Sequence, residues 1–429
     1  MRLIIVVRAD PAICGHSGEA RNLAEAAIAR GVPEVRILTW PVDVLAQAGI
    51  PLKPLDSILP YSPGITVERP EAVGDYKVPD GRFGAGIRGR LVELFSDGVP
   101  TVCMSLYLSP HTTLVTEALQ AARAMGFGQN VTTVAEAVGS DITNVVRSCV
   151  SEGRFGPAAY LLSSYLASDR PVAVSAYTKD LIVEAADTVD AGMGTSFAGA
   201  CRERVSVSYP AIDAGAYIDL DPVQVDDVLA ARGLTRGRYL LFLSRIAEAK
   251  GVDDLLAAYA ASRAKDDVEL VVAGTGPALA RSRELAAALP DGLGDRVRFL
   301  TDVDDAEKPA LMSACAAYVL PSKPRAEFVE TFGIALVEKM LSGGGPVITT
   351  DTGGIPEAVG DHAIRVTAGD PTSIAAGIDR AVLELGDLEL LNAADGARRH
   401  ALQFDRLAIF DRLLADLLGS VDHTAMSAA

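Results

Sequence analysis

The sequence predicts an α/β protein of two domains, each built on a parallel β-sheet. A chain of 429 residues is too long for one ordinary hydrophobic core and suits two domains of roughly 200 residues each. Short apolar runs alternate with helical patterns, which is typical of a parallel sheet wrapped by helices. Because this alternation occurs in two successive series, we expect two similar domains.

The two series give the expected strands and the domain limits. Strands are predicted at residues 3–7, 35–40, 99–106, 131–134, 172–175 and 205–208, and then at 239–243, 268–273, 297–300, 317–320, 346–350 and 363–366. The joint is predicted within 213–238, so the expected domains are 1–213 and 214–400. A helical pattern over 401–420 is long enough to return to the first domain.

One stretch, residues 49–89, departs from this alternation. It contains six prolines and seven glycines and shows little periodicity. Loops of this length in compact domains are often lids or binding loops. A functional loop and a merely irregular excursion both remain open.

The composition narrows the function classes. The net charge is −17, and a field of this sign repels phosphate backbones and anionic membrane surfaces. No run approaches the roughly 18 apolar residues of a spanning helix. Five scattered cysteines without Cys-x-x-Cys spacing argue against zinc and disulfides. We therefore expect a cytoplasmic protein with no nucleic-acid or membrane partner.

The strongest functional signal is a pair of carboxylates, Glu330 and Glu338, across the start of a predicted helix. An apolar run at 315–320 reads as a buried strand, so Glu330 falls in the strand-to-helix connection. Ligands of open α/β sheets collect at this place. Gly333 permits close backbone approach, and free N–H groups of the first helical turn can hold an anion. The alternative is a solvated helix face.

Two cations, Arg245 and Lys250, follow the predicted strand at 239–243. Cations at the carboxyl end of a strand suit a diphosphate, because Arg offers a planar fork and Lys a point charge. Their alternative is a salt bridge to Glu248 or to nearby acids. The turn at Gly274 and Gly276 lacks the third glycine of a dinucleotide fingerprint.

In the first domain, a short Gly-rich loop with Gly15 and His16 follows the first strand and opens a helix. Such a loop can face a phosphate or a sugar. His111 comes just beyond a buried strand, where cleft residues emerge, although a helix cap or a buried donor is the alternative.

Taken together, these motifs resemble a known family. Arg245 with Lys250, the glycine turn at 274–277, Glu330-x7-Glu338 and the Asp-Thr-Gly-Gly-Ile-Pro-Glu segment at 351–357 resemble the second domain of retaining GT-B glycosyltransferases of family 4. The segments 9–19 and 78–82 are similar to actinobacterial enzymes that add sugars such as kanosamine to aminoglycoside antibiotics. This implies two Rossmann-like domains facing across a cleft.

The resemblance also implies roles. Arg245 and Lys250 would neutralise the leaving diphosphate, Glu338 would bind the ribose, and Glu330, with the cleft histidine His111, would act at the transferred sugar. The implied donor-binding residues are Gly15, Arg245, Lys250, Gly274, Val303, Glu330, Thr331, Phe332, Gly333, Ile334 and Glu338. The donor is expected to be a UDP-sugar, and no cofactor or metal is expected. The spacings Asp219-x-Asp221 and Asp302-x-Asp304 are read as non-metal features.

The expected acceptor is a cationic aminocyclitol, a pseudodisaccharide containing 2-deoxystreptamine. Its proposed ligands are His16, Glu19, Asp75, Asp80 and Glu136. The family's His-Gly element is altered, because residues 134–141 contain no histidine. The alternatives are an inositol-phosphate or lipid acceptor, and a catalytically silent protein that only binds sugar nucleotides. The oligomeric state stays open, with a homodimer as one candidate.

Overall fold

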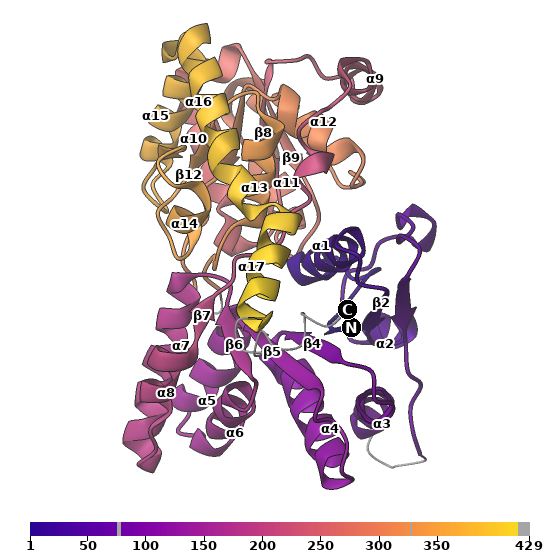
Figure 1. Ribbon diagram of the computed structural model, residues 1–429. Helices are drawn as coiled ribbons and strands as arrows, with labels where there is room; N and C mark the ends of the chain where they lie inside the picture. The colour runs from indigo at the N-terminus through magenta and orange to yellow at the C-terminus, as the bar shows by residue number, and fades with distance from the viewer. Residues whose placement is uncertain (75–78, 327, 419–429) are drawn as a thin grey trace. The chain divides into compact units, whose positions relative to one another are not determined.

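The computed structural model describes residues 1–74, 79–326 and 328–418 of the chain. The chain divides into two units (Figure 1). Unit 1 comprises residues 1–212 together with the chain from Arg406 onward, and unit 2 comprises residues 213–405. Each unit is an α/β structure with its own parallel sheet.

Unit 1 is built on a seven-stranded sheet in the order β3-β2-β1-β4-β5-β6-β7. Every pairing between neighbouring strands is parallel. The strands are β1 (Arg2–Val6), β2 (Glu34–Leu38), β3 (Ile65–Glu68), β4 (Thr101–Leu106), β5 (Val131–Ala137), β6 (Arg170–Ala173) and β7 (Ser206–Val207). The central strands β1 and β4 are buried along their whole length, which explains why most of their residues are apolar.

Helices cover both faces of this sheet. They are α1 (Gly15–Ala29), α2 (Val42–Gln47), α3 (Pro79–Ser96), α4 (Thr113–Ala124), α5 (Ser148–Ser151), α6 (Phe155–Leu166), α7 (Ala176–Met193), α8 (Phe197–Arg204) and α17 (Arg406–Leu418). The sequence sets the limits of α7 clearly, since the Ser175 side chain caps its start and Gly194, at φ 69°, ends it.

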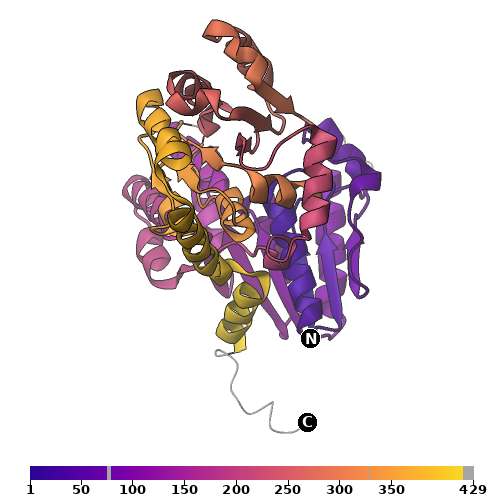
Figure 2. The same cartoon turned by 90° about the horizontal axis from the view of Figure 1, so that it is seen from above.

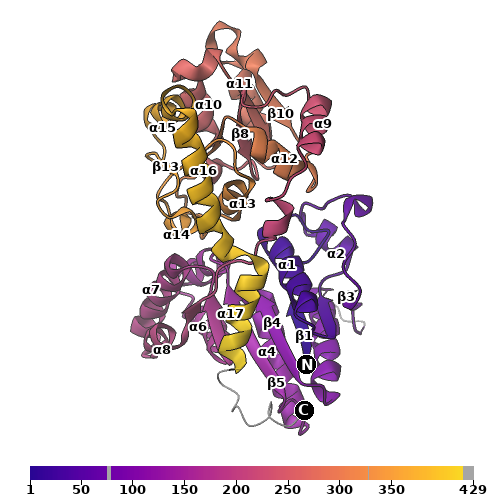
Figure 3. The same cartoon turned by 45° about the horizontal axis from the view of Figure 1, so that its top comes forward.

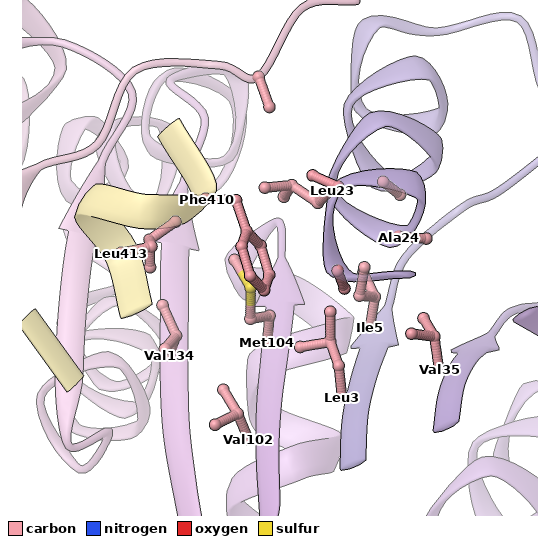
Figure 4. Packing of buried hydrophobic residues seen from close by; sticks show 14 of the residues in the cluster. Leu3, Ile5, Leu23, Ala24, Val35, Val102, Met104, Val134, Phe410 and Leu413 are labelled. Carbon is pink, nitrogen blue, oxygen red and sulfur yellow. The ribbon is translucent and has the colours of Figure 1, made fainter. Parts of the chain in front are cut away.

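The last described helix, α17, belongs to the core of unit 1. Phe410 and Leu413 are 5% and 8% exposed, and they pack toward Met104 and Val134 of the sheet and Leu23 of α1 (Figure 4). Figure 3 shows α17, in yellow, running beside α1. The apolar stripe of α17 therefore closes the face of the sheet that α1 leaves open.

Unit 2 repeats the plan with a six-stranded parallel sheet in the order β10-β9-β8-β11-β12-β13. Its strands are β8 (Tyr239–Leu243), β9 (Glu269–Ala273), β10 (Val297–Leu300), β11 (Ala317–Leu320), β12 (Val347–Thr349) and β13 (Ile364–Arg365). Its helices are α9 (Pro222–Arg232), α10 (Val252–Ala261), α11 (Leu279–Ala287), α12 (Glu307–Ala314), α13 (Ile334–Ser342), α14 (Ile355–Val359), α15 (Pro371–Asp379) and α16 (Asp387–Ala401). In Figure 2 the gold helix α16 leads along the chain into α17.

Two sequence predictions need correction. The stretch 49–89 is not one long loop, because β3 and the first half of α3 lie within it. The buried carboxylate of Asp10 contacts this stretch at two points. It accepts a hydrogen bond from the Tyr61 hydroxyl at 3.1 Å and lies 3.4 Å from the Lys53 ammonium. The predicted start of the last helix, residue 401, was also wrong. Ala401 is the last residue of α16, and α17 begins at Arg406. A short turn over Leu402–Phe404 interrupts the pattern.

Candidate functional site

Glu330 and Lys250 meet in unit 2. Glu330 lies in the connection between β11 and α13, and its carboxylate forms an ion pair with the Lys250 ammonium. The two side chains are only 12% and 11% exposed, and the ammonium also lies 4.8 Å from the centre of the Phe328 ring. The partner of Lys250 is thus the carboxylate predicted to bind sugar, whereas Glu248 lies 3.7 Å from Arg325.

Gly353 and Gly354 pack closely against the backbone of Glu330 and Thr331. A Cβ atom on Gly353, whose φ is 61°, would lie 2.0 Å from the Glu330 carbonyl oxygen, and one on Gly354 would lie 2.0 Å from the Thr331 carbonyl oxygen. The Gly354 N–H also donates to the Glu330 carbonyl at 2.9 Å. The glycine pair of the 351–357 motif therefore acts by backbone packing, which only a residue without Cβ allows.

The loops that follow β8 and β9 also pack backbone against backbone. A Cβ on Gly274 would lie 2.1 Å from the Ser244 carbonyl oxygen, and one on Gly276 would lie 2.3 Å from that of Ile246. Arg245 is exposed beside these turns. Within the described residues, no ion pair or hydrogen bond is recorded for its guanidinium, so this cation is available to an anionic ligand.

Helix α13 starts at the site. Gly333, at φ 105°, stands at its N-cap, and Ile334 is the first helical residue. The N–H groups of a first helical turn have no partner within the helix and favour anions. Phe332 is 2% exposed and packs edge to face on Phe404 at 5.0 Å, which anchors the backbone there. Val303 lies half-buried in the loop between β10 and α12.

Glu338, on α13, is held by two residues that sequence reasoning missed. Its Oε1 accepts from the Tyr217 hydroxyl at 2.8 Å and from the Lys308 ammonium at 2.7 Å. Tyr217 follows a short turn at Ala214–Ala216, and Lys308 lies in the first turn of α12. Neither residue carries a motif, and they lie 121 and 30 positions from Glu338, so no local signal could have found them.

Aspartates of the two Asp-x-Asp spacings form local hydrogen bonds and an ion pair. Asp221 caps α9 by accepting from Val223 N–H at 2.9 Å, and Asp304 accepts from the N–H groups of Ala306 and Glu307 at 2.9 and 2.8 Å. Asp302 pairs with Arg232 at 2.9 Å. Across the described parts of the chain, no group of three or more metal-ligating side chains is gathered in one place.

In unit 1, His111 is buried and both of its ring nitrogens are engaged. Nδ1 lies 2.7 Å from the Leu106 carbonyl oxygen, and Nε2 lies 3.2 Å from the indole nitrogen of Trp40. Burial lowers the pKa of His111 to about 4, so the ring is neutral, with Nδ1–H donating and Nε2 accepting. This arrangement matches the buried-donor alternative and leaves no ring nitrogen free to take a proton.

Two of the predicted acceptor ligands form a buried carboxyl pair. Glu19 of α1 and Glu136 of β5 are 3% and 1% exposed, and the two carboxyl groups interact electrostatically. Burial raises the pKa of both, and the Glu19 charge raises that of Glu136 further. Among the residues that the structure describes, the buried Oε1 of Glu136 has no hydrogen-bond partner.

A third buried acid, Asp141, stands near this pair. Its carboxylate accepts from the N–H groups of Leu108, Val138, Gly139 and Ile142 at 2.9 to 3.3 Å. Burial nevertheless raises its pKa to about 6. In the sequence, Asp141 ends the altered His-Gly element at residues 134–141. In the structure its carboxylate accepts hydrogen bonds from the N–H groups of this loop.

The remaining predicted ligands vary in how far they can be placed. Gly15 is exposed at the start of α1. Half-buried His16 lies 5.9 Å from the Tyr107 ring, and burial lowers its pKa to about 3. Asp80 lies in the first turn of α3, and its side chain is outside what the structure describes; Asp75 lies outside the described residues altogether. The Arg8 guanidinium lies over the same Tyr107 ring, 5.2 Å from its centre.

Sequence comparison shows what unit 2 is similar to. Residues 231–393 match the family model of glycosyl transferases group 1. The chain is 35% identical over 234 residues to a D-inositol 3-phosphate glycosyltransferase of Salinispora tropica, which covers 50% of this chain and 45% of that protein. It is 34% identical over 161 residues to a phosphatidyl-myo-inositol mannosyltransferase of Mycobacterium leprae, covering 36% and 40%. The chain thus matches less than half the length of these relatives.

Structural comparison extends over the whole chain. The Anabaena protein Alr3699/HepE, solved with UDP and glucose, superposes with a TM-score of 0.69 at 19% identity, covering 98% of this chain and all of that one. WaaG, a glycosyltransferase of lipopolysaccharide biosynthesis, gives 0.63 at 16% identity, covering 97% and 100%. No helix among the described residues is long and apolar enough to span a bilayer. The chain therefore has the GT-B fold, and the part of its second unit over residues 231–393 is similar to glycosyl transferases group 1.

Proposed function

We propose that this chain transfers a sugar from a nucleoside diphosphate to a hydroxyl of a cyclitol acceptor. The observation that carries the proposal is the Lys250–Glu330 ion pair near the start of α13, together with the exposed cation Arg245 after β8. It gathers a cation, a carboxylate and a helix N-terminus at the carboxyl edge of the unit 2 sheet. The match of residues 231–393 to group 1 glycosyltransferases supports the same reading.

The chemistry follows from these groups. The bond between the anomeric carbon and the diphosphate oxygen breaks, and negative charge grows on the leaving diphosphate. Arg245, Lys250 and the N–H groups of the first α13 turn stabilise that charge because they are already oriented toward it. Glu330 accepts from hydroxyls of the transferred sugar. With retention, the acceptor oxygen bonds to the anomeric carbon from the face that the diphosphate leaves, and its proton passes to a phosphate oxygen.

An inositol-type acceptor is the better-supported class. The Salinispora tropica and Mycobacterium leprae relatives are named for inositol-containing acceptors, and this favours our alternative over the aminoglycoside reading. In unit 1, the half-buried Arg8 supplies a cation near Tyr107 that suits a phosphate substituent. The donor base stays a proposal, with UDP favoured by the resemblance.

A 2-deoxystreptamine acceptor is the second candidate, and one observation favours it. Within the described residues, the buried acids Glu19, Glu136 and Asp141 of unit 1 form no ion pair with a cationic side chain. Carboxyl groups in such surroundings accept ammonium or hydroxyl donors and repel phosphate. The net charge of −17 would also steer a polycation toward the protein.

The test is release of nucleoside diphosphate from a panel of donors and acceptors. UDP-glucose, UDP-N-acetylglucosamine and GDP-mannose are each combined with inositol 3-phosphate, myo-inositol and neamine. Release that depends on inositol 3-phosphate supports the first class, and release that depends on neamine supports the second. Tight binding of a sugar nucleotide with no release under any combination would contradict the enzyme assignment and favour the silent binding protein.

A further inference from the structure

We propose that Tyr217 and Lys308 are positioning residues for donor binding. They hold one oxygen of Glu338 and thereby present the other oxygen to a ribose hydroxyl of the nucleotide. The inference rests on the proposed function and deepens it, because it adds two residues of unit 2 that no motif contains. All three side chains lie within one unit.

The geometry is a clamp on a single atom. The Tyr217 hydroxyl donates to Glu338 Oε1 at 2.8 Å and the Lys308 ammonium to the same oxygen at 2.7 Å. A carboxylate oxygen offers two lone-pair sites, so these two donors fill Oε1. In the described part of the chain no hydrogen bond to Oε2 is recorded, and its two sites remain for a ligand.

The clamp is well buried and held from several sides. The Glu338 and Lys308 side chains are 13% and 19% exposed, and Tyr217 is 6% exposed. The Lys308 ammonium also lies 5.6 Å from the centre of the Tyr217 ring, close enough for a cation–π contact. Burial and the Glu338 charge raise the pKa of Tyr217, so its hydroxyl keeps the proton that it donates.

Two physical effects would aid nucleotide binding. A fixed carboxylate loses little rotamer entropy when a ligand hydroxyl donates to it. The Lys308 charge also offsets that of Glu338, so an approaching diphosphate meets a neutral pair and not a lone carboxylate. A purely structural clamp, which only tethers the Tyr217 segment to α12 and α13, would supply neither effect.

The experiment compares ligands with and without the ribose hydroxyls. Calorimetry measures dissociation constants for UDP and GDP, and the tighter of the two is then compared with its 2′,3′-dideoxy analogue. The unaltered protein should prefer the ribonucleotide by about tenfold or more, since a hydrogen bond to a charged group is worth roughly this factor. Tyr217→Phe and Lys308→Met should each reduce that preference to about threefold or less.

Matched variants separate positioning from damage. Lys308→Arg keeps a donor at the end of a long chain and should restore part of the preference. Tyr259→Phe is the control, because Tyr259 lies in the same unit and its hydroxyl donates to the Val268 carbonyl at 2.8 Å, away from Glu338. It should leave the preference unchanged.

Each outcome decides the question. A preference that persists in Tyr217→Phe and Lys308→Met, or equal weakening of both nucleotides, overturns the clamp while the proposed function stands. If neither UDP nor GDP binds the unaltered protein, the proposed function fails, and the clamp fails with it.

Discussion

Replacing Glu136 by Gln should flatten the dependence of stability on pH. The folded protein keeps protons on Glu19, Glu136 and Asp141 to a higher pH than the unfolded chain does. Between about pH 4.5 and 7 it therefore binds more protons than the unfolded chain, and its stability falls as the pH rises. Glu136→Gln removes one of these ionising groups, and with it the charge interaction between residue 136 and Glu19.

Glu19 shows how much one buried carboxyl of this kind contributes to the pH dependence of stability. Burial, its largest cause, raises the pKa of Glu19 from 4.5 to about 7, and each pH unit is worth about 1.4 kcal/mol. The wild-type protein should thus lose on the order of 3 kcal/mol between pH 4.5 and pH 8 through this site. The variant keeps this contribution of Glu19 but lacks that of Glu136, whose pKa is raised by burial and by the Glu19 charge, so its total loss of stability should be clearly smaller.

Urea unfolding of the full chain at pH 5 and pH 8, followed by circular dichroism, measures this difference. Glu203→Gln is the control, because Glu203 is an exposed carboxylate of the same unit and its removal should not change the pH dependence. Equal loss of stability from pH 5 to pH 8 in the wild type and in Glu136→Gln would refute the description of Glu136 as a buried carboxyl with a raised pKa.

Two further predictions concern unit 2. Gly353→Ala should lower turnover about tenfold or more and reduce stability by roughly 1–3 kcal/mol, because its Cβ would meet the Glu330 carbonyl oxygen. Gly233→Ala has a similar φ of 60° but open space around it, so it should cost stability without touching activity; equal activity in both variants would count against the supporting role. Glu330→Gln should mainly lower kcat, whereas Glu338→Ala should mainly raise the donor KM. Steady-state kinetics check this division, and the reverse pattern would exchange the two roles.

The fold could be predicted because it depends on local patterns. Buried parallel strands such as β1, β4, β8 and β9 are continuous apolar runs, and their alternation with helices gives the architecture directly. The errors lie where no periodicity exists. Strand β3 is short and partly exposed, and the turn at Leu402–Phe404 interrupts an apolar stripe without a glycine or proline to mark it.

The site could be predicted only as far as its motifs reach. Sequence reasoning named Glu330 and Lys250 separately, and the structure joins them across 80 positions. The clamp on Glu338 could not be predicted from the sequence, because Tyr217 and Lys308 reach Glu338 only through tertiary contacts. His111 shows the converse, since its position after β4 suggests chemistry while Leu106 and Trp40 occupy both of its nitrogens.

Turnover of Arg245→Ala and Lys250→Ala tests the central claim most directly. Each variant removes a positive charge that we propose stabilises the departing diphosphate, and each should lower kcat about 100-fold or more in the assay of nucleoside diphosphate release. Thermal unfolding monitors the fold, since Lys250→Ala leaves Glu330 without its partner. Arg281→Ala, which removes an exposed cation of the same unit, should retain full activity. Near-normal turnover in both Arg245→Ala and Lys250→Ala would contradict the assignment of these cations to the diphosphate.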